Sequence, residues 1–285
     1  MTNIDVKLIA DGIKNCIDRI SCEVEPSCAT ALAAARKKED NATARFALDV
    51  MCRNIEYAKA SHLPVCQDTG MVVAFIRIGQ EVRLTGDFLD EAVNGAVREA
   101  FAPLRKSVLD PVSRVNTKDN TPAVIHTSIV RGDTVEVEVM LKGFGSENMS
   151  AIYMLNPAQG LETAKDLIVD TVRKAASNPC PPVIIGVGLG GTFEKCAEMS
   201  KHALFRKIGS DNPDPVLNAL EKELCGRINS LGIGAQGFGG SLTALGVFIE
   251  SYPTHISSLP VAVNVLCHCS RAARFTVDEG GLNYE

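Results

Sequence analysis

The chain has 285 residues, of which 46% are hydrophobic and 22% charged, a composition that can form a folded core. Its formal net charge is -5 and it has no Trp, which argues against binding to nucleic-acid phosphates or stacked bases. The sequence shows no signal-peptide pattern and no apolar run long enough for a membrane span. We therefore expect a cytoplasmic protein whose 10 cysteines are reduced.

Residues 1–60 are predicted to form a helical N-terminal portion. Apolar side chains recur there at steps of three and four residues, which places them on one helical face: Val6, Ile9, Ile13, Ile17 and Ile20. Residues 30–37 are rich in alanine, and residues 43–58 continue the helical pattern. Pro64 ends this part, because the residue before a proline is driven out of the helical region.

The rest of the chain mixes strands with helices. Strands are predicted over 71–78, 183–187, 242–250 and 261–266, and helices over 87–101, 161–176, 192–204 with Thr192 as N-cap, and 215–230. Residues 123–130 and 134–141 alternate around Arg131-Gly132-Asp133, which predicts an antiparallel hairpin. The expected fold is α+β, a helical N-terminal part followed by a mixed, mostly antiparallel sheet packed with helices, in a single domain over 1–285.

One glycine pattern favours a different class of protein. Gly186, Gly188 and Gly191 match G-x-G-x-x-G between a predicted strand and a predicted helix, as in dinucleotide-binding folds. An NAD-binding oxidoreductase is therefore an alternative. Asp211 has the spacing of the acid that would bind the ribose, but no predicted strand precedes it. The same strand-to-helix geometry could also bind a carboxylate.

Three cysteines lie in separate runs rich in proline, glycine or polar residues: Cys66, Cys180 and Cys267. Without a local Cys-x-x-Cys they suit an iron–sulfur cluster with three protein ligands and one open iron better than a zinc site. Cys269 lies two positions after Cys267 and could compete with it if both were on one strand face. Cysteines within helical patterns are expected to be buried apolar residues: Cys16, Cys22, Cys28, Cys52 and Cys225.

Five motifs follow one another along the chain in this order: Cys66-Gln67-Asp68-Thr69-Gly70, Asn116-Thr117-Lys118-Asp119-Asn120-Thr121-Pro122, Lys142-Gly143-Phe144-Gly145-Ser146-Glu147-Asn148, Cys180-Pro181-Pro182 and Gly232-Ile233-Gly234-Ala235-Gln236-Gly237. Together they resemble the α subunit of the two-subunit class I fumarate hydratases, related to L(+)-tartrate dehydratase. The resemblance runs from about Cys66 to Arg274.

The resemblance implies a [4Fe-4S] cluster held by Cys66, Cys180 and Cys267, and substrate binding by Gln67, Asp68, Arg105 and Gly145. It also implies catalytic roles for Asp68 and His255. Each residue has a structural alternative: a loop cap for Asp68, a surface helix end for Arg105, a bulge for Gly145 and a hydrogen-bonded structural role for His255.

The implied activity is a lyase of the tricarboxylic acid cycle that interconverts (S)-malate and fumarate, or alternatively dehydrates L(+)-tartrate to oxaloacetate. Elimination needs a base and further cations, which the family takes from a β subunit. We therefore expect a chain that is inactive alone and assembles into an α/β hetero-oligomer around a small dicarboxylate. A cluster protein without turnover is a further alternative, although Gln67, Asp68 and Arg105 favour a substrate site.

Overall fold

The computed structural model describes residues 1–284, and the chain divides into two compact units. Unit 1 comprises Met1–Glu25, Tyr57–Phe144 and Arg271–Glu285, and unit 2 comprises Pro26–Glu56 and Gly145–Ser270. The single domain expected over 1–285 stays a prediction. The α+β class is confirmed, since helices and mixed sheets occur in both units.

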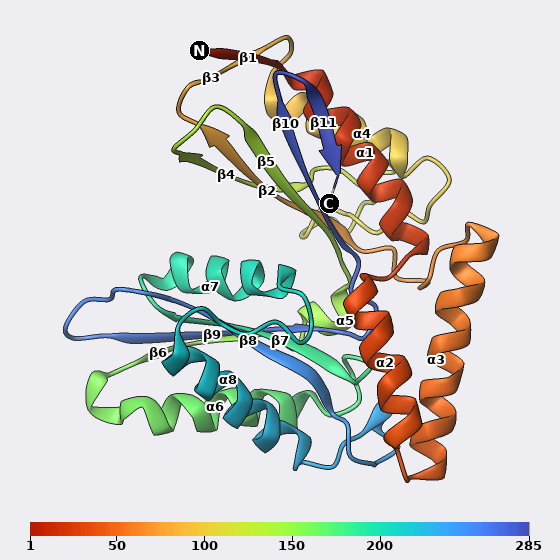
Figure 1. Ribbon diagram of the computed structural model, residues 1–285, viewed down its shortest axis with the longest axis vertical. Coiled ribbons are helices and arrows are strands. Elements are labelled where there is room, and N and C mark those ends of the chain that lie inside the picture. Colours follow the sequence, from red (N-terminus) through yellow and green to blue (C-terminus); the bar gives the residue numbers. More distant parts are fainter. Residues whose placement is uncertain (285) are drawn as a thin grey trace. The chain divides into compact units, whose positions relative to one another are not determined.

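Unit 1 is built on a five-stranded sheet with the order β11-β10-β5-β2-β4. Its strands are β2 Met71–Gly79, β4 Val124–Val130, β5 Val135–Lys142, β10 Ala272–Asp278 and β11 Gly281–Tyr284. Helices α1 Val6–Cys22 and α4 Leu89–Ala100 pack together beside it, and β1 Thr2–Asp5 pairs with β3 Val82–Thr85 in a separate parallel pair (Figure 1).

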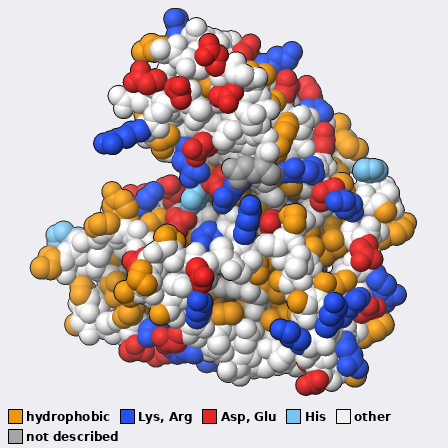
Figure 2. All heavy atoms as spheres, viewed as in Figure 1, with side chains coloured by type: hydrophobic (Ala, Val, Ile, Leu, Met, Phe, Trp, Pro, Cys, Tyr) orange, Lys and Arg blue, Asp and Glu red, His pale blue; other side chains and the backbone are white. Residues whose placement is uncertain are grey.

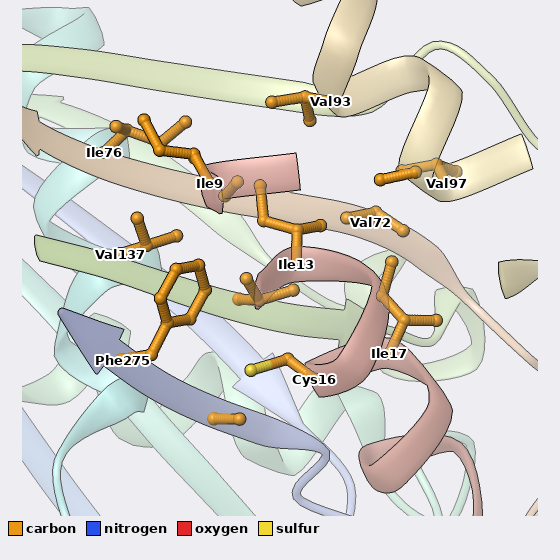
Figure 3. Packing of buried hydrophobic residues seen from close by; sticks show 14 of the residues in the cluster. Ile9, Ile13, Cys16, Ile17, Val72, Ile76, Val93, Val97, Val137 and Phe275 are labelled. Carbon is orange, nitrogen blue, oxygen red and sulfur yellow. The ribbon is translucent and has the colours of Figure 1, made fainter. Parts of the chain in front are cut away.

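The core of unit 1 lies between α1 and the sheet. The predicted apolar face of α1 is confirmed, because Ile9, Ile13 and Ile17 are fully buried and point toward the sheet (Figure 3). Val72 and Phe275 meet them from β2 and β10. Burial of this face stabilises α1, at about 25 cal/mol for each Å² of apolar surface removed from water.

The predicted hairpin of residues 123–141 is wrong. β4 and β5 do not pair with each other, because β2 lies between them, parallel to β4 and antiparallel to β5. The loop between them crosses the end of β2, where Gly79 N donates to Thr134 O and Glu81 N to Gly132 O. β2 is buried along most of its length whereas β4 is largely exposed, so the more apolar strand occupies the interior of the sheet and β4 its edge.

Unit 2 contains a four-stranded sheet with the order β6-β9-β7-β8. Its strands are β6 Ala151–Leu155, β7 Val183–Gly190, β8 Ala244–Tyr252 and β9 Leu259–Leu266. Helix α7 Phe193–His202 covers one face, and α6 Gly160–Ala175 and α8 Pro215–Asn229 cover the other (Figure 1). Helix α2 Pro26–Lys38, most of α3 Ala42–Ser61 and the short α5 Phe144–Glu147 complete the unit.

The glycine pattern on β7 is explained by the packing of α7. A Cβ atom on Gly186 would lie 2.0 Å from the carbonyl oxygen of Ser200, and one on Gly188 would lie 2.1 Å from that of Cys196. Only glycine allows the helix to approach the strand this closely. Thr192 occupies the predicted N-cap position, but its hydroxyl donates to the Glu194 carboxylate, 2.6 Å away, instead of capping the helix. The pattern therefore follows from helix–strand packing without a nucleotide.

The predicted helices match α1 to α4 and α6 to α8 within a few residues of each end. No helix among residues 1–284 combines the length and the apolarity needed to cross a bilayer. Acidic and basic side chains both occur on the face drawn in Figure 2.

Candidate functional site

The structure describes all 10 cysteines. Three of them both lie in loops and are at least partly exposed: Cys66, Cys180 and Cys267. The five cysteines expected in helices are there, as is Cys196 on α7. Burial raises the pKa of the Cys16 and Cys196 thiols to about 11, so both stay protonated at neutral pH. Because the thiolate is the metal ligand, Cys16 and Cys196 are poor donors.

The Cys66 loop precedes β2 and is held by Asp68. One carboxylate oxygen of Asp68 accepts from the Phe144 backbone N–H at 2.7 Å, and the other accepts from the Gly70 N–H at 3.0 Å. Asp68 therefore caps the turn that follows the cysteine and ties it to the end of β5, the structural role considered above. A carboxylate has about four lone-pair positions, so two remain for a ligand. Gln67, which lies between Cys66 and Asp68 in the sequence, is exposed.

Arg105 lies in the loop after α4 and its side chain is exposed. The Thr69 hydroxyl donates to the Arg105 carbonyl oxygen at 2.7 Å. Fully buried Asn120 joins the same loops, since its Nδ2 donates to Gly70 O at 3.2 Å and its Oδ1 accepts from Ser107 N at 2.8 Å. The structure thus places the Arg105 backbone beside the Cys66 loop.

Two buried cations in unit 1 were not predicted as site residues from the sequence. Arg271 is 2% exposed and its Nη1 donates to the Asp68 carbonyl oxygen at 2.7 Å. Lys142 is 1% exposed and its Nζ donates to the Gly143 carbonyl oxygen at 3.2 Å. Strand periodicity alone would have indicated that Lys142 ends a buried strand, but nothing local marks Arg271.

In unit 2, the Cys180 loop and the Cys267 loop are joined by His268. The ring Nδ1 of His268 lies 3.0 Å from the Cys180 carbonyl oxygen, and the His268 carbonyl oxygen accepts from the Cys28 thiol at 3.1 Å. Cys180 has a left-handed backbone with φ of 54°, which a non-glycine residue adopts only with such support. The cis bond Pro181-Pro182 follows it.

Cys267 and Cys269 have different surroundings. β9 ends at Leu266, so the two residues are not on one strand face as the sequence allowed. Cys269 is 4% exposed, whereas Cys267 is partly exposed. The accessible thiol is therefore that of Cys267.

Gly145 and His255 lie elsewhere in unit 2. Gly145 is exposed within α5 rather than in a bulge, and a Cβ atom there would meet only Asn178 O at 3.8 Å, an ordinary contact. The fold itself does not require glycine at this position. His255 is exposed in the loop before β9, with its Nδ1 2.7 Å from the Ser257 hydroxyl. β9 separates it from Cys267, and its 8 residues span roughly 23 Å.

The three candidate cysteines fit an iron–sulfur cluster by donor type, loop position and exposure. Cys180 and Cys267 belong to unit 2 and Cys66 to unit 1. Within residues 1–284 no three His, Cys, Asp or Glu side chains form a ready-made metal-binding group. The ligand set accordingly stays a proposal.

Known proteins resemble the chain over nearly its full length. The profile of the fumarate hydratase (Fumerase) family matches residues 10–276. A Methanocaldococcus jannaschii protein, provisionally named L(+)-tartrate dehydratase subunit alpha, is 39% identical over 253 residues, which cover 85% of this chain and 88% of that protein.

The Escherichia coli K12 protein named L(+)-tartrate dehydratase subunit alpha is 32% identical over 278 residues, which cover 95% of this chain and 91% of that protein. A Shigella sonnei protein of the same name matches with the same values. The family profile and these relatives support hydro-lyase chemistry. The chain therefore belongs to the fumarate hydratase (Fumerase) family and resembles the α subunits of L(+)-tartrate dehydratases.

Proposed function

We propose that this chain is the α subunit of a [4Fe-4S]-dependent hydro-lyase acting on a small 2-hydroxy dicarboxylate, with Cys66, Cys180 and Cys267 as cluster ligands. The observation that carries the proposal is that these three cysteines alone, among 10 described, combine a loop position with exposure. Membership of the family supports the reaction class. Reduced thiols also fit the cytoplasmic location that the proposal assumes.

Dehydration breaks a C–O bond and a neighbouring C–H bond, forms a C=C bond and releases water. When bound, the cluster supplies an open iron as a Lewis acid for the departing hydroxyl group. In this proposal the Arg105 guanidinium binds a substrate carboxylate through two parallel hydrogen bonds. Gln67 and the remaining lone pairs of Asp68 orient the substrate hydroxyl, and the Gly145 backbone is open to close approach.

The base that takes the carbon-bound proton is proposed to come from a β subunit. The relatives are named as alpha subunits, which supports an α/β hetero-oligomer. The chain alone should then be inactive. His255 was predicted to act near the cluster, and the 8 residues of β9 lie between it and Cys267 in the chain. The catalytic role of His255 stays a prediction.

Two substrates fit this chemistry. The family description supports interconversion of (S)-malate and fumarate, a step of the tricarboxylic acid cycle. The names of the relatives support the second candidate, dehydration of L(+)-tartrate to oxaloacetate. Both substrates present two carboxylates and a hydroxyl group, so Arg105 and Gln67 could bind either one.

The test is anaerobic purification of the chain together with its β subunit, followed by iron, sulfide and visible-absorption measurements. Turnover of (S)-malate and L(+)-tartrate is then compared under the same conditions, with the chain alone as a control. We expect iron and sulfide in the complex and lost in a Cys66→Ser variant, but retained in a Cys225→Ser variant. Zinc, or no metal, after strictly anaerobic work would refute the cluster.

A further inference from the structure

We propose that Arg271 is a positioning residue that holds the Cys66-Gln67-Asp68 loop in the shape needed for catalysis; this rests on the proposed function. Arg271 is 2% exposed, and its Nη1 donates to the Asp68 carbonyl oxygen at 2.7 Å. It is the largest fully buried side chain in the chain that the structure describes. It also follows Cys267 by four positions in the sequence.

Burial of a guanidinium is costly, because the charge loses its hydration. Arg271 recovers part of that cost through Asp68, yet its Nε has no hydrogen-bond partner among residues 1–284. A neutral side chain could make one hydrogen bond to a carbonyl group without this penalty. A buried arginine that costs this much and contacts the Cys66 loop therefore points to a role at that loop, beyond stability of the fold.

The surrounding backbone makes room for this contact. A Cβ atom on Gly143 would lie 3.1 Å from the Asp68 carboxylate and 3.3 Å from Nη2 of Arg271, so it would push these side chains by a few tenths of an ångström. The Arg271 carbonyl oxygen accepts from Leu141 N at 2.9 Å, which anchors the backbone of Arg271 to the end of β5. Arg271 is thereby fixed at both its backbone and its side chain.

Asp68 is consequently held on two sides. Its carboxylate accepts from the Phe144 and Gly70 N–H groups, and its carbonyl group accepts from Arg271. The carboxylate contacts fix the side chain, and the Arg271 contact fixes the peptide group on the C-terminal side of Asp68. Loss of Arg271 should leave the loop free to rotate about this residue and should displace both Gln67 and the Cys66 thiol.

The experiment compares Arg271→Lys and Arg271→Met with a control, Arg274→Lys, three positions further along the chain on β10. Arg274 lies on β10 and its Nε pairs with the Glu138 carboxylate at 2.7 Å. The first readout is the rate at which iodoacetamide alkylates each cysteine in the cluster-free full chain, followed by mass spectrometry. We expect Arg271→Met to accelerate alkylation of Cys66 several-fold and to leave buried Cys16 unchanged, with Arg271→Lys intermediate.

The second readout is the complex with the β subunit. We expect kcat to fall roughly tenfold or more in Arg271→Met with little change in KM. The reason is that a displaced catalytic loop reduces stabilisation of the transition state more than it reduces the affinity for substrate. Wild-type rates of Cys66 alkylation in both Arg271 variants would overturn the inference. Equal acceleration at Cys66 and Cys16 would also overturn it, since that result indicates general destabilisation.

The two proposals can fail separately. A wild-type complex without iron or turnover refutes the proposed function, whereas the alkylation rates of the cluster-free chain still decide whether Arg271 positions the loop. If Arg271→Met does not fold, as judged by circular dichroism, Arg271→Lys decides the question. It retains the charge but has no planar fork, so Cys66 alkylation should still exceed the wild-type rate.

Discussion

The ring Nδ1 of His268 lies 3.0 Å from the carbonyl oxygen of Cys180, so this nitrogen carries the proton of the hydrogen bond. The contact links two proposed cluster ligands of unit 2, because His268 directly follows Cys267 in the sequence. It resembles the outer hydrogen bonds that orient ligands in other metal sites.

Replacement of His268 by leucine should therefore loosen the cluster without unfolding the chain. We expect faster loss of iron to a chelator, by roughly tenfold, the lower end of the effects seen for outer ligands. The measurement is the rate of iron release from the anaerobic complex. His62→Asn, at an exposed position in unit 1, is the control and should release iron at the wild-type rate. Equal release from His268→Leu and wild type would contradict the linking role.

The pair Cys267 and Cys269 gives a second prediction. Cys267→Ala should abolish cluster assembly, since its thiol is the accessible one, whereas Cys269→Ala should retain iron and sulfide. Cys269 is buried, so its loss should lower the free energy of unfolding by about 1 kcal/mol. Iron and sulfide analysis and urea unfolding measure the two effects. A cluster retained in Cys267→Ala would show that the ligand assignment is wrong.

Hydrophobic periodicity predicted the helices well, because a helix with one buried face has apolar residues every three to four positions in its sequence. The spacing of Ile9, Ile13 and Ile17 recurs in the structure as the buried side of α1. The order of strands in the sheet was harder to predict from the sequence. The alternation around Gly132 indicated two adjacent strands, but the choice of partner depended on β2, fifty residues earlier in the chain, which is more deeply buried than β4.

In the candidate site, too, some features could be predicted from local sequence and others could not. The three cysteine loops could be found from their local composition, and their exposure agrees with that choice. Arg271 could not be found in this way, because it acts through a hydrogen bond to Asp68, which is far away in the sequence. Such side chains resemble any other polar residue until the fold brings their partners together.

Arg105 gives a third prediction. Its side chain is exposed, so Arg105→Met should leave the free energy of unfolding within about 0.5 kcal/mol of wild type. Loss of the bidentate carboxylate contact should lower kcat/KM by roughly tenfold or more. Lys106→Met is the matched control, since the Lys106 ammonium donates to Ala102 O, 2.6 Å away. Steady-state kinetics with (S)-malate and L(+)-tartrate provide the measurement, and equal losses in both variants would argue against a substrate role.

The packing of α7 on β7 gives a fourth prediction. Gly188→Ala would place a methyl group 2.1 Å from the Cys196 carbonyl oxygen, so the helix must move away. We expect a loss of about 3 kcal/mol in the free energy of unfolding. Gly226→Ala on α8 is the control, because the added Cβ there meets no atom within 4 Å beyond its chain neighbours and the nearby backbone of its own helix.

That control should gain up to about 1 kcal/mol, since alanine is the better helix former. Thermal and urea unfolding of the two variants measure the difference. Similar stabilities for both would show that the β7 glycines are not required for packing and would reopen the nucleotide-binding alternative.

The fifth prediction concerns acid stability and Asp119. Hydrogen bonds from the Thr121 hydroxyl and backbone N–H, and from Arg98, lower the pKa of Asp119 from 3.8 to about 2. The folded state therefore favours the charged form. The stabilisation is fully present above pH 3.8 and is lost as the pH falls toward 2, because the unfolded chain takes up the proton first.

Asp119→Asn should thus be less stable than wild type at about pH 5, by 1–2 kcal/mol as an order of magnitude, and the difference should shrink at about pH 3. Urea unfolding of both proteins at the two pH values gives the comparison. Thr121→Val serves as the companion variant, since it removes the hydroxyl that contributes most to the shift while leaving the carboxylate in place. It should lose part of the same pH dependence, and a wild-type advantage over Asp119→Asn that stays constant with pH would show that these hydrogen bonds do not favour the charged carboxylate.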